Sequence, residues 1–309
     1  MVSTRRAPVL GKIAAELERA VARRREAGSA GGTAGIRLAA GPGWSVHDVV
    51  CTYGPGDRPF EERHGAVAIA VVIGGTFRYR TPSGQAVMTP GSLMLGNPGQ
   101  PFECGHEHGA GDRCVSFHYE LGFFEQVLAA AGAQDDRFGV SRLPPLRDTA
   151  PVVARAMIGV AGSETAWEEL ALETAAVALG LAAGQPGSRP PLPARSVARV
   201  TQSVRAIERD PAARISLARL AAEAGLSPYH YLRTFTLVTG VTPHQFIVRT
   251  RLRAAAARLA RESARVIDVA LESGFDDISN FNRAFRAEFG LTPRAYRQRS
   301  ASSPGPRRW

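Results

Sequence analysis

Five side chains that are able to bind a transition metal ion lie within residues 104–118. Thiolates and imidazoles are the ligands that Zn²⁺ prefers in proteins. If the segment forms a hairpin with a loop over residues 109–113, alternate residues share a face, and positions 104, 106 and 108 lie opposite 118, 116 and 114. That register predicts a zinc site on one face of the hairpin. Its ligands would be Cys104, His106, His108, Cys114 and His118.

Other interpretations of this segment remain open. In the simplest, Cys104 and Cys114 are small buried hydrophobic residues, and the histidines bond to backbone groups or carboxylates. In another, His106 and His108 with Asp112 are similar to the HxH and carboxylate of metal-binding cupin enzymes, although Glu is usual there and no second cupin motif follows. A hairpin without metal, a metal-sensing or redox-sensing site, and a metal-dependent enzyme are therefore three hypotheses.

Short β-forming segments must position this cluster. Turn-forming Gly and Pro residues separate them, a pattern that over residues 36–120 is typical of a small β-barrel or jelly roll. Residues 121–184 become helical and rich in Ala and Leu, and helices in this place cover a barrel or form a dimer. The expected strands are Ser45–Thr52, Val67–Ile73, Thr76–Arg80 and Val115–Tyr119.

The first 35 residues predict an amphipathic helix followed by a flexible linker. Leu10, Ile13, Leu17 and Val21 recur at helical spacing within residues 8–27. We expect a peripheral helix or a partly ordered tail there. A second linker, rich in Gly and Pro, is expected over residues 185–195.

Positive charge is concentrated in the C-terminal part of the chain. The 309 residues include 38 Lys and Arg and 28 Asp and Glu, and residues 196–309 hold 19 of the basic but only 9 of the acidic ones. A general preference for Arg in the genome would not produce this asymmetry, so we expect a polyanionic partner. No apolar run approaches the ~18–20 residues of a membrane span. The three cysteines do not form a disulfide framework, which favours a cytoplasmic protein.

The same C-terminal part contains an imperfect repeat. The first copy includes Ala221, Gly225 and Gly240-Val-Thr-Pro243, and the second has Ala270, Gly274 and Gly290-Leu-Thr-Pro293, about fifty residues later. An Ala four residues before a Gly lets two helices approach closely, while the Gly adopts the positive φ of the turn between them. The repeat predicts two helix-turn-helix units.

Each unit has a helix with one buried and one outward face. Ser227 and either Asp276 or Asp277 are the expected N-caps. The aromatic pairs Tyr231 with Phe235 and Phe281 with Phe285 have the i, i+4 spacing of core residues. The residues expected to face DNA are Tyr229, Leu232, Arg233 and Thr236 in the first helix, and Ser279, Asn282, Arg283 and Arg286 in the second.

A long helix is predicted between the two copies, from Thr242-Pro243 to about Arg261. Roughly 18 residues span about 27 Å, comparable to the ~34 Å between successive major-groove faces of B-DNA. The alternative is an arginine-coated bundle without a nucleic-acid role. Expected core positions are Phe246, Leu252, Ala255, Ala256 and Leu259, and the arginines expected to point outward, toward phosphates, are Arg249, Arg251, Arg253 and Arg258.

Residues 196–299 resemble the DNA-binding domain of the AraC/XylS family of transcriptional regulators. Leu226–Phe235 is similar to the family's first recognition helix, and Ala270–Phe285 with Phe289–Tyr296 is similar to its second signature. The resemblance implies seven helices, two major-groove insertions, and an N-terminal sensing or dimerising domain of cupin type, to which residues 36–120 are more loosely similar. By position, the base-contacting residues fall on Tyr229, Leu232, Arg233, Ser279, Asn282 and Arg283.

Groove chemistry assigns each of these side chains a base. Arg233 and Arg283 can pair with guanine, Asn282 with adenine, and Leu232 with a thymine methyl group.

The expected fold class is α+β. A cupin-like β-barrel over 36–120, a helical connector over 121–184 and an all-α double helix-turn-helix domain over 196–309 follow one another along the chain. We expect a sequence-specific transcriptional activator without enzymatic activity that binds double-stranded promoter DNA and no membrane. The resemblance implies contact with RNA polymerase, and a homodimer and a small-molecule or metal effector are further expectations. The alternatives are a metal-dependent cupin enzyme tethered to DNA, a metal-sensing or redox-sensing regulator, and a structural nucleoid protein.

Overall fold

Two antiparallel sheets form the N-terminal half of the protein. The computed structural model describes residues 9–132, 135, 137–184 and 192–301. Within them the sheets have the strand orders β1-β2-β9-β4-β7-β10 and β3-β8-β5-β6. The strands are β1 (Thr33–Gly41), β2 (Trp44–Cys51), β3 (Phe60–Arg63), β4 (Val67–Gly75), β5 (Phe77–Thr81), β6 (Gly84–Met88), β7 (Leu93–Gly96), β8 (Pro101–Gly105), β9 (Asp112–Tyr119) and β10 (Arg142–Leu143).

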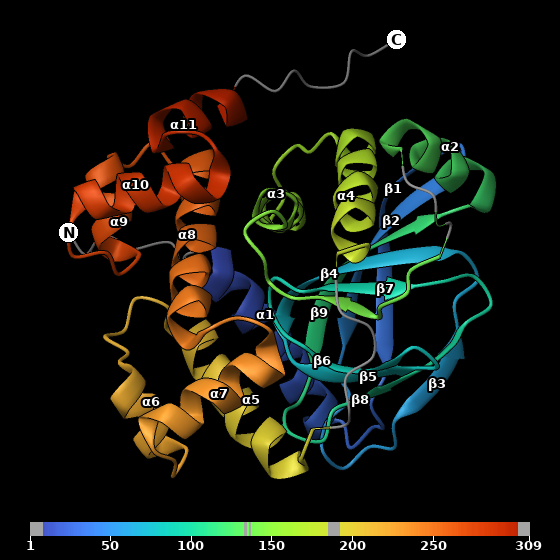
Figure 1. Cartoon of the computed structure of the whole chain (residues 1–309), viewed down its shortest axis with the longest axis horizontal. Helices are drawn as coiled ribbons and strands as arrows, with labels where there is room; N and C mark the ends of the chain where they lie inside the picture. Colours follow the sequence, from blue (N-terminus) through green and yellow to red (C-terminus); the bar gives the residue numbers. More distant parts are fainter. Residues whose placement is uncertain (1–8, 133–134, 136, 185–191, 302–309) are drawn as a thin grey trace.

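Helices flank this barrel and make up the C-terminal half (Figure 1). The α+β fold class is therefore confirmed, and the four expected strands are present with small shifts in their ends. The helices are α1 (Val9–Glu26), α2 (Leu121–Ala131), α3 (Ala150–Val160), α4 (Trp167–Ala182), α5 (Ala194–Arg209), α6 (Leu217–Glu223), α7 (Pro228–Thr239), α8 (Pro243–Arg261), α9 (Val266–Glu272), α10 (Ile278–Phe289) and α11 (Pro293–Ala301).

Alternation along the central strands creates two apolar layers. On β4, Val67, Ile69 and Val71 belong to the core that the sheet shares with the helices. Ala70 and Val72, between them in sequence, face the space between the sheets. Side chains of a strand point alternately to opposite faces, so a strand covered on both sides is continuously apolar. The helical side is closed by α3 and α4, where Tyr119 donates a hydrogen bond of 2.7 Å to the carbonyl of Ala171.

The N-terminal helix is not peripheral, so that prediction is wrong. Helix α1 packs against β4, α5 and α8, and Ile13, Leu17 and Val21 are buried; the side chain of Leu10 lies outside the described ones. The apolar stripe that identified the helix is buried between the two halves of the protein. The expected linker up to residue 35 also ends early, because Thr33 already pairs with Cys51 in the β1–β2 ladder.

The described part of the C-terminal half contains the seven expected helices, α5 to α11. Gly225 and Gly274 have φ values of 61° and 89°, so both turns use the conformation that favours glycine. Ser227 and Asp277 cap α7 and α10, as predicted. Helix α8 separates α6 and α7 at one end from α9, α10 and α11 at the other (Figure 1). Among the described residues, no helix is both long and apolar enough to cross a membrane.

The C-terminal half is docked on the N-terminal half through continuous apolar packing. Val87 of β6 lies in the same core as α5 and α7, and Ala254 and Ala257 of α8 belong to the core around the larger sheet. Helix α5 already begins at Ala194, inside the expected linker over 185–195. Residues 185–191 of that linker lie outside the described residues, as do 1–8 and 302–309 of the first and last predicted segments.

Candidate DNA-contacting surface and effector cavity

Helix α7 separates its buried and outward residues as predicted. Tyr231 and Phe235 are fully buried, whereas Tyr229 is 63% exposed. Arg233 is also exposed, and its guanidinium carbon lies 5.8 Å from the centre of the Tyr229 ring. Leu232 and Thr236, on the same side, are half-buried. These four residues of α7 therefore present a guanidinium group, a phenol ring, an apolar leucine side chain and a threonine hydroxyl.

Helix α10 has the same organisation at the other end of α8. Phe281 and Phe285 are fully buried. Arg283 is exposed and donates a 3.2 Å hydrogen bond to the side-chain oxygen of Asn280. The other expected contact residues, all exposed, are Ser279, Asn282 and Arg286. Their positions agree with an outward face, while their contact with DNA stays a prediction.

The four arginines of α8 that were expected to point outward do not do so, and this prediction is wrong. Arg253 is only 3% exposed. Arg249 pairs with Glu288 at 3.2 Å and donates to the carbonyl of Pro145, and Arg258 pairs with Glu262 and Glu272. Arg251 likewise donates to the carbonyls of Pro211 and Ala213, both at 2.8 Å. Helix α8 is enclosed by other elements along most of its length, so these four arginines contact protein groups, and their contact with phosphates stays a prediction. Its predicted core positions, Phe246, Leu252, Ala255, Ala256 and Leu259, are all buried.

A cavity of about 420 Å³ lies between the two sheets of the barrel. Its walls are mostly apolar, but the acidic side chains of Glu62 and Asp112 and three imidazoles, His47, His64 and His118, also line it. Burial lowers the pKa of all three, with His64 at about 4, so they are neutral at physiological pH. His64 lies 2.7 Å from the hydroxyl of Tyr79, and His118 lies 2.9 Å from that of Ser116. Concave apolar space with a few fixed polar groups is characteristic of a small-molecule site.

The predicted metal hairpin over 104–118 does not form. Strand β8 pairs with β3 and β5, whereas β9 pairs with β2 and β4 in the other sheet, so Cys104 and Cys114 are not strand neighbours. His106 and His108 lie in the connection between the strands instead of on β8. His108 borders a hollow beside α5, while His118 lies in the cavity. The five predicted ligands therefore do not gather at one point, because the segment crosses between sheets.

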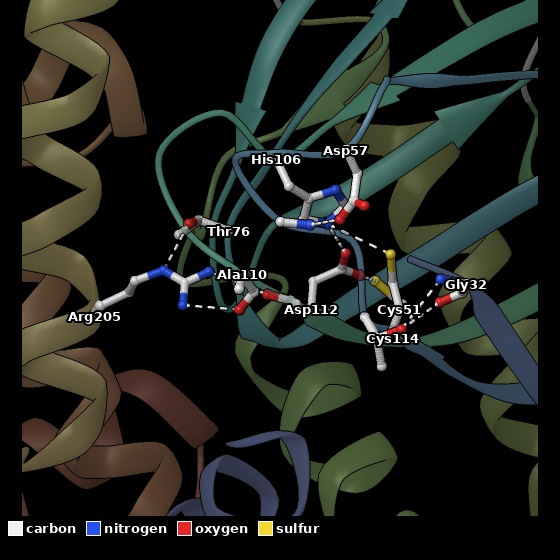
Figure 2. A network of polar contacts seen from close by, with 12 residues as sticks. Gly32, Cys51, Asp57, Thr76, His106, Ala110, Asp112, Cys114 and Arg205 are labelled. Carbon is white, nitrogen blue, oxygen red and sulfur yellow. Dashed lines mark hydrogen bonds and ion pairs between the residues drawn. The ribbon is translucent and has the colours of Figure 1, made fainter. Parts of the chain in front are cut away.

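A different cluster forms next to the cavity. Nε2 of His106 lies 2.6 Å from Oδ1 of Asp112 and 3.6 Å from Sγ of Cys51, and Cys114 donates to Oδ2 of Asp112 at 3.4 Å (Figure 2). All three cysteines are free and buried, and burial raises the pKa of each thiol. Cys51 was absent from the predicted ligand set because it is 55 residues from His106 in sequence, and only the packing of β2 beside β9 brings them together.

Two charged residues of α5, which sequence analysis did not single out, connect this cluster to the C-terminal half. Arg205 donates to the carbonyls of Ala110 and Gly111 at 3.0 and 3.1 Å and to Thr76 at 3.3 Å (Figure 2). The carboxylate of Glu208 accepts a 3.1 Å hydrogen bond from the backbone N–H of Gly75. No local sequence pattern marks either residue, because their partners are about 95 to 133 residues away.

Gly75 makes this close contact possible. It has a φ of 77°, and a Cβ at this position would lie 2.3 Å from the carbonyl oxygen of Gly111. Any larger residue would push apart the loop that Arg205 holds.

Two family models match the chain. The model described as a helix-turn-helix domain matches residues 220–299, and the model described as an AraC-like ligand binding domain matches residues 50–179. The chain belongs to the AraC family. Because the second match extends from β2 into α4, this AraC-family protein has its helical connector within the matched ligand-binding region.

Individual relatives cover smaller parts of this AraC-family chain. The MmsAB operon regulatory protein of Pseudomonas aeruginosa is 37% identical over 93 residues, which are 30% of each protein. The transcriptional activator AarP of Providencia stuartii is 34% identical over 84 residues, 27% of this chain and 62% of AarP. A solved transcriptional regulator of Chromobacterium violaceum, with an AraC-type DNA-binding domain, is 26% identical with a TM-score of 0.33, covering 36% of this chain and 100% of the other. The matched part is thus less than a third of the Pseudomonas protein's length.

Proposed function

We propose that the protein is a sequence-specific transcriptional regulator, probing promoter DNA with α7 and α10 and binding an effector in the barrel cavity. The observation that carries this proposal is the duplicated outward face, with Arg233 and Arg283 exposed at equivalent positions at the two ends of α8. The 19 residues of α8 give a rod of about 28 Å, comparable to the ~34 Å repeat of the major groove.

We further propose that the protein forms a homodimer and contacts RNA polymerase in the cytoplasm. Activation through RNA polymerase and homodimer formation are proposed by analogy within the family, since AarP is named a transcriptional activator. Action on promoter DNA in the cytoplasm agrees with three cysteines that are all unpaired. We assign no catalytic reaction to the cavity.

The effector proposed for the cavity is a small and largely apolar molecule with one or two hydrogen-bonding groups. Apolar walls favour burial of hydrocarbon surface, and the neutral imidazoles of His47, His64 and His118 can donate or accept hydrogen bonds. A strongly anionic molecule would lose hydration without a matching positive charge, because the described lining of the cavity includes neutral imidazoles, Glu62 and Asp112 but no Lys or Arg.

Selection of bound sites from random duplex DNA tests the DNA-binding function. We expect enrichment of a motif that spans two successive major grooves on one face of the duplex. Equal binding to all sequences at moderate salt would instead identify a structural nucleoid protein, because such proteins bind the phosphate backbone without base contacts.

Replacing Arg233 or Arg283 by Ala is expected to weaken binding to the selected site by ~1–3 kcal/mol and to relax the preference at one base pair. The reason is that each exposed guanidinium can pair with the edge of one guanine. Electrophoretic band-shift titrations with the selected site and its single-base variants measure both effects.

Arg37→Ala serves as the matched control, because Arg37 is an exposed arginine on β1 in the other half of the protein. The Arg37→Ala variant should bind the selected site with the affinity of the wild type. A uniform loss of affinity for all DNA sequences in the Arg233 and Arg283 variants would assign these residues to phosphate contact and contradict base recognition.

A further inference from the structure

Three buried side chains beside the cavity have the ligand types and the spacing of a transition-metal site. One ligand atom from each of Cys51, His106 and Asp112 lies within 4.8 Å of the other two. The three come from different places in the chain: the end of β2, the connection after β8 and the start of β9. Thiolate, imidazole and carboxylate are the three side-chain ligand types of protein zinc sites.

The spacing is close to that of a tetrahedral zinc centre. With ligand bonds of about 2.0–2.3 Å, neighbouring ligand atoms are separated by about 3.3–3.6 Å. Sγ of Cys51 and Nε2 of His106 are 3.6 Å apart, which matches this separation. Nε2 of His106 and Oδ1 of Asp112 are 2.6 Å apart and would separate by somewhat less than 1 Å when an ion enters between them.

The imidazole of His106 is fixed in a buried position with one nitrogen aimed at the other two side chains. Its side chain is 1% exposed, held between the rings of Tyr53 and Phe77. Its Nε2 atom faces both Oδ1 of Asp112 and Sγ of Cys51. Burying an imidazole and a carboxylate together costs free energy, because both groups lose their hydration. A cation that binds both groups reduces this cost.

We propose that Cys51, His106 and Asp112 bind one divalent transition metal ion of the Zn²⁺ class. The Cys51 thiol would lose its proton to solvent on binding, and the thiolate, imidazole and carboxylate would be three ligands of the ion. Cys51 and Asp112 also line the cavity, so the fourth coordination position faces the space in which the effector is proposed to bind. This site differs from the predicted hairpin site, because it includes Cys51 and omits His108 and His118.

The proposed site is directly connected to α5. The carbonyl of Gly111, which accepts a hydrogen bond from Arg205, belongs to the peptide unit that precedes Asp112. Movement of the Asp112 carboxylate toward an ion therefore acts on the contact that joins the barrel to the first helix of the C-terminal half. The part of this inference that concerns DNA affinity rests on the proposed function, whereas the metal site itself does not.

Titration of the full-length, metal-free protein with Co²⁺ tests the site. We expect one Co²⁺ per chain, a thiolate-to-cobalt charge-transfer band in the near ultraviolet, and displacement of Co²⁺ by Zn²⁺. His106→Gln and Asp112→Asn should each weaken Co²⁺ binding by at least about 100-fold, since loss of an outer-shell partner alone costs 10–100-fold. Cys51→Ser should remove the charge-transfer band, and circular dichroism shows whether each variant is folded.

Matched controls lie within the same segment. His108→Gln changes an imidazole two residues from His106 that borders a different hollow, and it should bind Co²⁺ as the wild type does. No Co²⁺ binding by the wild type would overturn the proposal. Equal losses of Co²⁺ affinity in the His106 and His108 variants would also overturn it. The same holds for a charge-transfer band that persists in a folded Cys51→Ser variant.

A second measurement tests the connection to α5. Zn²⁺ is expected to change the affinity for a selected DNA site, and Arg205→Met should bind Co²⁺ normally but lose this change. Metal binding without any change in DNA affinity would refute the connection and leave the site intact. Absence of sequence-specific DNA binding with or without Zn²⁺ would refute the proposed function while the Co²⁺ result still stands.

Discussion

Replacing Arg253 by Met is expected to lower the free energy of unfolding by about 3 kcal/mol, because the change removes a buried cation that interacts electrostatically with two buried carboxyl groups. Arg253 of α8 is 3% exposed and donates to Thr250 at 3.0 Å and to the carbonyl of Pro90 at 3.4 Å. Burial lowers its pKa to about 10, which still leaves it charged at neutral pH, and Glu208 and Glu288 act in the opposite direction. Without Arg253, the carboxyl groups of Glu208 and Glu288 lose a favourable interaction with a positive charge. Helix α8 also loses its hydrogen bond to the β6–β7 connection.

Urea denaturation followed by circular dichroism measures this effect. Arg261→Met is the matched control, since Arg261 is an exposed arginine at the end of the same helix. Substitutions at such surface positions usually change stability by less than about 0.5 kcal/mol. Equal denaturation midpoints for the two variants would show that the buried charge is not needed for docking.

Glu208→Gln is expected to stabilise the protein increasingly as the pH rises from about 5 to 8. Burial raises the pKa of Glu208 from 4.5 to about 7, against the opposing effects of Arg205, the N–H of Gly75, Arg253 and Arg209. The native state therefore retains a proton that the unfolded chain has already released. The contribution of Glu208 to the free energy of unfolding is most favourable below pH 4.5 and is lost as the pH rises toward 7, a change of about 3 kcal/mol. Glutamine keeps an oxygen for the Gly75 N–H but carries no charge.

The difference between variant and wild type isolates this effect from the cavity histidines. The pKa values of His47, His64 and His118 are lowered in the native state. Their contribution to the free energy of unfolding is therefore lost as the pH falls below about 6.5, whereas that of Glu208 is lost as the pH rises. They are present in both proteins and cancel in the difference. Thermal unfolding from pH 5 to pH 8 is the measurement. A difference that stays constant over this range would show that Glu208 is ionised in the native state.

Local sequence patterns were sufficient to predict the main helices and strands and the outward faces of α7 and α10. The Ala-to-Gly spacing, the caps at Ser227 and Asp277 and the aromatic pairs depend on contacts within a few residues, and all of them are present in the structure. Helical periodicity also placed the core of α8 correctly. It was wrong for the arginines of α8, because periodicity identifies a polar face but not which neighbouring element covers it.

The amino-acid sequence by itself determined that this protein has a β-rich half, a helical connector and a duplicated helix-turn-helix half with exposed Arg233 and Arg283. Only the tertiary structure decided that Cys51, His106 and Asp112 meet, that His108 and His118 lie apart from them, and that Arg205 and Glu208 join the two halves. The physical reason is the range of the contacts. Turns and helix faces are governed by residues a few positions apart, whereas strand order brings together side chains whose separation in sequence carries no pattern.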